Sequence, residues 1–87
     1  MKKYKINKNY IVQRTGNKTS IFDSEESILY TLNGTASYIF NLLRKGVAEV
    51  EISLRITKQY SINNAQAIKD TKQLVKELKK LNIIISN

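Results

Sequence analysis

The sequence lacks cysteine and histidine altogether, and this excludes several kinds of chemistry. Without these residues the chain can form no disulfide, no thiolate or imidazole catalyst and no Cys/His metal site. Its longest uninterrupted apolar run, the three isoleucines at residues 83–85, is far shorter than the roughly 20 residues that cross a bilayer. The basic start, Lys2 and Lys3, is followed by no apolar segment of the kind found in signal peptides. These absences predict a cytoplasmic protein with no membrane partner.

Positive charge is what the sequence has in excess, with 15 Lys+Arg against 7 Asp+Glu and a formal net charge of +8. The hydrophobic content of 41% is that of an ordinary globular protein. A chain of 87 residues is expected to form a single domain with a small but sufficient core. Residues 1–9 are polar and Lys-rich, so we expect either a flexible arm or an extension of a strand there.

The first half of the chain has the pattern of short β-strands. β-Branched and aromatic residues fill three segments, and turn-forming residues separate them. The expected strands are residues 10–12, 19–22 and 28–32, with turns at residues 15–18 and 23–26. Short turns between consecutive strands predict a three-stranded antiparallel β-meander.

After residue 32 the apolar residues recur with the 3.6-residue period of a helix. Three helices are expected: the first is capped by Asn33 or Thr35 and ends at Lys45 and Gly46, and the others span about 48–60 and 65–81. Asn63 or Asn64 is the expected cap of the third helix. The predicted core consists of Phe22, Ile39, Phe40, Leu43, Ile52, Ile56, Leu74 and Leu78. The fold class is therefore α+β, with helices on one side of a small sheet and a layout like a winged helix-turn-helix.

The sequence offers little for catalysis. Glu49 and Glu51 lie at a helix start, where carboxylates complement the helix dipole, and Asp70 and Glu77 are expected on a solvated helix face. No phosphate-binding glycine loop, nucleophile elbow or calcium loop is present in the sequence. We therefore expect a protein that is not an enzyme, with no catalytic residue, metal or cofactor.

The third predicted helix carries a stripe of positive charge. At about 100° per residue, its lysines cluster on a face next to the apolar one. The stripe consists of Lys69, Lys72, Lys76, Lys79 and Lys80, with Ile68 and Val75 on the seam. Such a field attracts an anionic partner, either a nucleic acid bound by a winged helix or an acidic peptide. Dispersed arginines and the carboxylates at the start of the second helix make nucleic acid the second choice.

The third predicted strand has an edge that the sequence does not protect. Residues 27–32 contain neither charge nor proline, the usual means of blunting an edge strand. Either a helix or the isoleucines at residues 83–85 cover this edge, or it is open for β-strand addition by a peptide.

The ordered set of segments resembles the PqqD-like proteins. The resemblance covers about residues 12–86 and rests on the order of its parts rather than on any one motif. The matching segments are a strand hairpin, YTLNGTA (30–36), IFNLL (39–43), KG (45–46), EI (51–52), Tyr60 and LKKLNII (78–84). The chain departs from the family pattern in having Val-Ala-Glu at residues 47–49, where a Ser or Thr cap is expected, and Phe40, where Trp or Leu is frequent.

The resemblance implies a recognition element for ribosomally made, modified peptides. Such proteins bind the leader segment of a precursor as an added strand and deliver it to a modifying enzyme or a leader peptidase. The lasso-peptide type is slightly favoured over the pyrroloquinoline-quinone type. Carried onto this sequence, the peptide-binding residues would be Ile28, Leu29, Tyr30, Thr31 and Leu32 on the edge, facing Ile68, Lys69, Lys72, Val75, Lys76 and Lys79 on the third helix.

Overall fold

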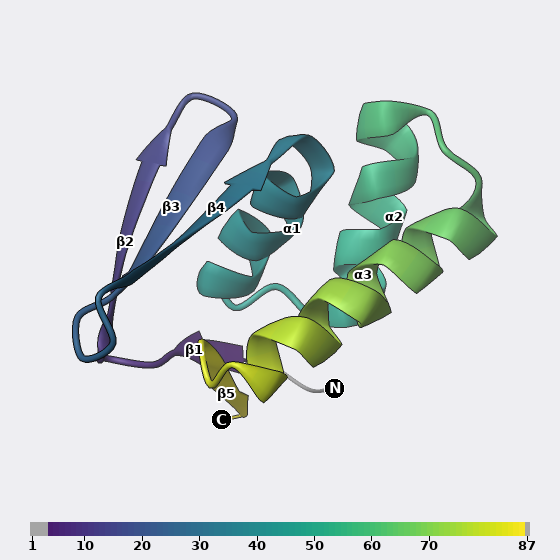
Figure 1. Ribbon diagram of the computed structural model, residues 1–87. Helices are drawn as coiled ribbons and strands as arrows, with labels where there is room; N and C mark the ends of the chain where they lie inside the picture. The colour runs from purple at the N-terminus through teal and green to yellow at the C-terminus, as the bar shows by residue number, and fades with distance from the viewer. Residues whose placement is uncertain (1–3, 87) are drawn as a thin grey trace.

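A computed structural model describes residues 4–86 and contains a three-stranded sheet, a two-stranded sheet and three helices (Figure 1). The elements in chain order are β1 (Tyr4–Ile6), β2 (Tyr10–Thr15), β3 (Lys18–Asp23), β4 (Ile28–Asn33), α1 (Gly34–Arg44), α2 (Glu49–Tyr60), α3 (Asn64–Lys80) and β5 (Ile84–Ser86). The predicted α+β fold, a three-stranded antiparallel meander followed by three helices, is confirmed.

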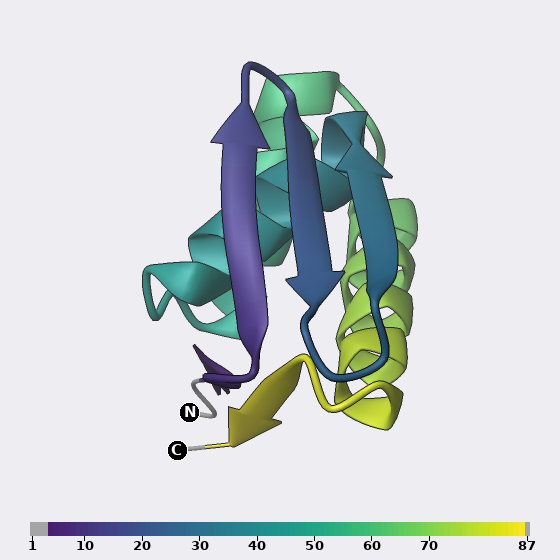
Figure 2. The same ribbon diagram turned by 60° about the vertical axis from the view of Figure 1, so that its left-hand side comes forward.

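The larger sheet has the strand order β2-β3-β4, and its helix-covered face carries the core (Figure 2). Side chains alternate between the two faces of a strand, so neighbours in sequence face opposite ways. Ile21 of β3 is fully buried against the helices, and Phe22 therefore lies on the open face, where it is 36% exposed. The prediction that Phe22 belongs to the core is wrong for this reason.

The core forms where α1 packs between the sheet and the other two helices. Phe40 is fully buried at its centre. Of the other predicted core residues, Ile39, Leu43, Ile52, Ile56 and Leu78 are buried, whereas Leu74 is partly buried at the margin of the core.

A buried polar cluster links β3 to α1 inside this core. The hydroxyl oxygens of Thr19 and Ser37 lie 2.6 Å apart, and the Asn41 amide donates to Thr19 Oγ1 at 2.8 Å. The carbonyl oxygen of the Asn41 side chain accepts from Arg44 at 2.9 Å. Because a buried polar group is costly without a partner, this cluster fixes the position of α1 on the sheet.

The two ends of the described chain pair with each other. β1 and β5 form an antiparallel ladder from Tyr4↔Ser86 to Ile6↔Ile84, and Tyr4 and Ile84 are buried. A flexible arm and a strand extension were the two alternatives expected for residues 1–9, and residues 4–6 form a short strand, β1. Residues 1–3 of the expected arm lie outside the described residues.

Capping residues set the helix boundaries. The side chain of Asn63 accepts from the Gln66 amide at 2.8 Å, which confirms one of the two predicted caps of α3. Asn33 occupies the cap position of α1 without a side-chain hydrogen bond. Gly34, with φ +52°, lets β4 run directly into α1, since few other residues adopt this backbone conformation.

No helix within residues 4–86 is both long and apolar enough to cross a bilayer.

Truncation of Phe40 tests whether the core is centred as described. Phe40→Ala is expected to lower the free energy of unfolding by about 3–5 kcal/mol, because it removes a buried ring and leaves a cavity. Chemical denaturation followed by circular dichroism measures the change. Val50→Ala, at an exposed position of α2, is the control and should stay within about 0.5 kcal/mol of wild type. A similar small effect of Phe40→Ala would contradict this assignment of the core.

Candidate functional site: a groove between an edge strand and a helix

The edge of β4 is the free edge that lies next to α3. β4 pairs with β3 on one side only, from Asp23↔Ile28 to Lys18↔Asn33. The isoleucine tail, which was one possible cover for this edge, pairs with β1 instead. In Figure 2, β4 is the outer strand of the sheet and α3 runs beside it. Within residues 4–86, no strand pairs with the second edge of β4.

A groove lies between β4 and α3. Its strand wall is formed by Leu29, Tyr30, Thr31 and Leu32. Its helix wall and floor are formed by Leu74, Glu77, Leu78, Leu81, Ile21 and Ile83. The predicted edge residues thus line the groove, with the exception of Ile28, which is exposed at the start of the strand.

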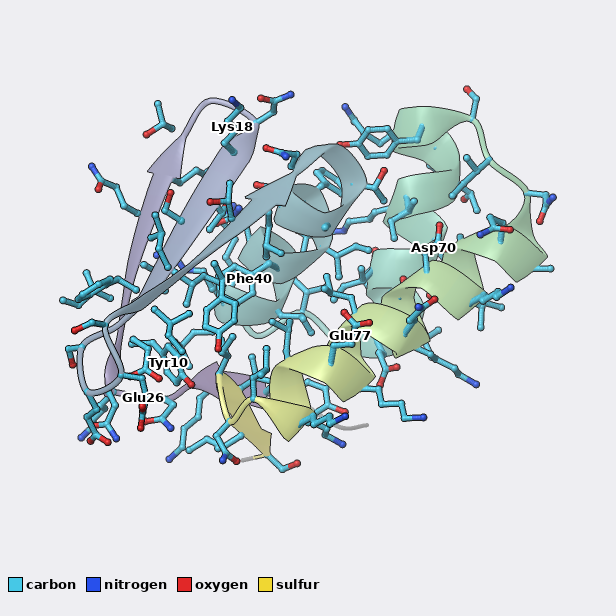
Figure 3. The ribbon with its side chains drawn as sticks, in the orientation of Figure 1. Tyr10, Lys18, Glu26, Phe40, Asp70 and Glu77 are labelled. Atoms are coloured by element: carbon cyan, nitrogen blue, oxygen red, sulfur yellow. The ribbon has the colours of Figure 1, made fainter. Side chains whose placement is uncertain are left out.

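The groove is mainly apolar. Tyr30 and Leu32 face the helices and are half-buried, and Leu81 is 39% exposed at the opposite wall. Glu77, which is labelled on α3 in Figure 3, is the one charged side chain among the lining residues. A strand with apolar side chains on one face could seat them here, while its backbone satisfies the unpaired N–H and C=O groups of β4.

An apolar row crosses the open face of the sheet and ends at the same edge. Ile11 pairs with Phe22, which pairs with Leu29, and all three side chains point away from the helices. Directly opposed residues in a sheet pack against each other. A strand added to β4 could therefore extend this row with one further apolar residue beside Leu29.

The predicted helix wall does not lie in this groove. Lys72, Val75, Lys76 and Lys79 line a different hollow together with Tyr4 and Glu49. Ile68 lines a third hollow with residues of α2, and Lys69 is exposed on α3. Val75 is only 4% exposed and belongs to the core. The structure thus brings the edge residues together but separates them from the six predicted helix residues.

The geometry of α3 explains this separation. Its buried residues Ala67, Thr71 and Val75 face the core, and the flanks on either side of them face different neighbours. At about 100° per residue, Lys72 lies about 160° around the helix from Leu74. Leu74 is on the flank next to β4, and Lys72 is on the flank next to α2 and β1. Sequence analysis missed Leu74, Glu77 and Leu81 as groove residues, although the period of α3 places them on one face.

Hydrogen bonds from the first residues of β2 and the preceding turn hold the C-terminal end of α3. The Tyr10 hydroxyl donates to the carbonyl of Leu81 at 2.6 Å, and the Asn7 side chain donates to the carbonyl of Asn82 at 2.8 Å. Burial, with a contribution from the nearby Asp23 carboxylate, raises the pKa of Tyr10. The hydroxyl therefore remains a donor over the whole neutral range.

A small antiparallel sheet with an open edge and three helices on one face has the layout of a winged-helix-like α+β domain. The sequence of residues 19–84 matches the family model of coenzyme PQQ synthesis protein D, PqqD. The match covers most of the chain, so this protein belongs to the PqqD family, as its ordered segments predicted. No curated protein sequence matches the chain.

Two solved structures share the fold. One is a lasso peptide synthetase B1 complexed with the leader peptide, with a TM-score of 0.87 and 22% identity over 95% of this chain and 98% of that chain. The other is TbiB1 in complex with the TbiA(beta) leader peptide, with a TM-score of 0.84 and 19% identity over 92% of this chain and 93% of that chain. At these identities the likeness demonstrates the fold.

Removal of the Tyr10 hydroxyl tests whether it fixes the end of α3. Tyr10→Phe is expected to lower the free energy of unfolding by about 0.5–1.5 kcal/mol at neutral pH, because Leu81 loses its donor. Because the pKa of Tyr10 is higher in the folded than in the unfolded chain, its hydroxyl contributes stability at pH values below the unfolded pKa of about 10. This contribution is lost as the pH rises through the folded pKa. The difference between the two proteins should therefore shrink in alkaline solution.

Urea unfolding at a series of pH values measures this difference. Tyr60→Phe, at the end of α2, is the control for loss of a tyrosine hydroxyl elsewhere. A stability difference for Tyr10→Phe that is absent at neutral pH, or that grows with alkalinity, would contradict the assigned role.

Proposed function

We propose that this protein binds the leader segment of a ribosomally made precursor peptide as an added strand on β4. The observation that carries the proposal is the unpaired edge of β4 beside an apolar groove. Membership of the PqqD family and the fold shared with two proteins solved with leader peptides support it. The leader is proposed to run antiparallel to β4. Residues 1–87 are proposed to form one peptide-recognition domain.

The groove favours a particular leader chemistry. Residues on one face of the added strand contact Tyr30, Leu32 and Leu81 and should be apolar. Glu77 faces the same space, so a neutral or basic leader residue fits next to it better than an acidic one. This differs from the acidic leader expected from the sequence, because the lysines thought to meet it lie on the other flank of α3.

The protein is proposed to act without catalysis, in the cytoplasm, where precursor peptides are synthesised. By holding the leader, it raises the effective concentration of the precursor at a modifying enzyme or leader peptidase of the same pathway. Within residues 4–86 there is no group of three or more His, Cys, Asp or Glu side chains that could hold a metal ion. The residues that line the groove include no cysteine, histidine or lysine.

Substitution of Leu81 tests the groove. Leu81→Asp is expected to weaken leader binding at least about tenfold, or about 1.4 kcal/mol, because a charge is desolvated in an apolar contact. Leu54→Asp is the matched control, since Leu54 is also half-exposed but lies on α2, outside the groove. The measurement is a fluorescence anisotropy titration with the labelled leader segment of the precursor peptide of the same pathway.

Circular dichroism confirms that both variants remain folded. Equal affinity of Leu81→Asp and wild type would place the leader elsewhere. Binding of a DNA duplex, with no binding of the leader, would instead support the winged-helix nucleic-acid alternative.

The absence of catalysis has its own test. The purified protein, incubated with the precursor alone, is expected to leave the mass of the peptide unchanged, because the sequence contains no cysteine, no histidine and no nucleophile-elbow or phosphate-binding motif. Addition of the processing enzyme should produce the modified or cleaved peptide. Mass spectrometry of both reactions decides the matter, and turnover by this chain alone would overturn the proposal.

A further inference from the structure

The flank of α3 that faces away from β4 forms a second surface, in which two hollows meet. One hollow lies between α2 and α3, and the other lies between α3, Tyr4 and Glu49; both are lined by Glu49 and Lys72. We call this the α2–α3 surface and define it by Val50, Leu54, Ile68, Lys72, Lys76 and Lys80. None of these six residues lines the groove beside β4.

The part of this surface next to α2 is apolar and exposed. Val50 is 66% exposed, Leu54 is 49% exposed and Ile68 is 39% exposed. Val50 and Leu54 are one helical turn apart on α2, and Ile68 faces them across the hollow from α3. Single exposed apolar residues are common, but three around one hollow indicate a contact surface for another protein.

The part next to β1 is basic. Lys72, Lys76 and Lys80 are exposed, and the Lys79 ammonium lies 5.1 Å from the centre of the Tyr4 ring. Glu49 is the single carboxylate among the lining residues, and its side chain accepts a hydrogen bond from the Tyr4 hydroxyl at 3.3 Å. Among residues 4–86, Arg55 and Glu51 form the one ion pair, so none of these lysines is in direct contact with a carboxylate of the described residues.

We propose that the α2–α3 surface docks the processing enzyme through a segment that pairs apolar side chains with carboxylates. The apolar side chains contact Val50, Leu54 and Ile68, and the carboxylates face Lys72, Lys76 and Lys80. The chemistry of the partner follows from the surface. Its identity as the enzyme that receives the leader rests on the proposed function.

Two observations favour a protein partner over the leader or a nucleic acid. The leader, paired with β4, lies on the other flank of α3, and the buried residues of this helix separate the two surfaces. A phosphate backbone would use the lysines but would leave the three exposed apolar side chains without a partner. A segment that is both acidic and apolar uses the whole surface, and opposite charge speeds its association.

Biolayer interferometry with the purified processing enzyme of the same pathway tests the proposal. The variants are Leu54→Asp and the double variant Lys72→Glu/Lys76→Glu. Each is expected to weaken enzyme binding at least about tenfold, and the effect of the double variant should decrease as salt screens the charges. Lys18→Glu, at the start of β3, is the control for charge reversal at an exposed lysine elsewhere, and Leu81→Asp is the control for the leader groove.

The same variants are titrated with the labelled leader and with a DNA duplex. The proposal requires that Leu54→Asp and the double lysine variant keep the leader affinity of wild type while losing the enzyme. It is overturned if wild type does not bind the enzyme, if both variants bind it as wild type does, or if Lys18→Glu causes the same loss. It is also overturned if the double lysine variant loses affinity for the leader, or if it loses affinity for DNA while it still binds the enzyme. Enzyme binding that depends on this surface, without any leader binding, would refute the proposed function alone.

Discussion

The groove exists because α3 is held beside β4 without covering its edge, and this position depends on contacts at the end of the helix. The Tyr10 hydroxyl and the Asn7 side chain bind the carbonyls of Leu81 and Asn82, directly after α3. The β1–β5 ladder continues from this point and joins the two ends of the chain. A helix anchored at one end by backbone acceptors can run along a strand at a fixed spacing while the N–H and C=O groups of that strand remain free. Loss of the anchor would therefore affect the shape of the groove before it affected the core.

The larger sheet has one face covered by helices and one open face. Three helices can cover only one face of the sheet, so β3 buries Thr19 and Ile21 and exposes Phe22. The buried hydroxyl of Thr19 is acceptable because Ser37 and Asn41 of α1 satisfy it, and this also fixes α1 on the sheet. With α1 fixed and β4 joined to it through Gly34, the direction of the edge strand is set.

The features that depend on local sequence pattern could be predicted, whereas those that depend on tertiary packing could not. The 3.6-residue period identified the helices, and Asn63 identified the start of α3. Both signals can be found in the sequence because each involves residues only a few positions apart. The edge strand was identified because residues 27–32 lack charge and proline. The predicted peptide-binding residues of α3 lie outside the groove beside β4. Period alone defines an apolar face with two flanks and does not show which flank meets β4. Phe22 was placed in the core because of its residue type, although the alternation of side chains along β3 required one of Ile21 and Phe22 to face outwards.

The two flanks of α3 have different chemistry, and this difference bears on how the protein would work. The flank beside β4 is apolar with Glu77 as its charge, whereas the opposite flank gathers Lys72, Lys76 and Lys80. The buried residues of α3 lie between the two flanks and separate them; they are Ala67, Thr71, Val75 and Leu78. Two ligands that bind opposite flanks of one helix need not compete for contacts. A leader held on one flank and an enzyme held on the other would become parts of one complex, in which the encounter of precursor and enzyme depends on the length of the connecting peptide rather than on their bulk concentrations.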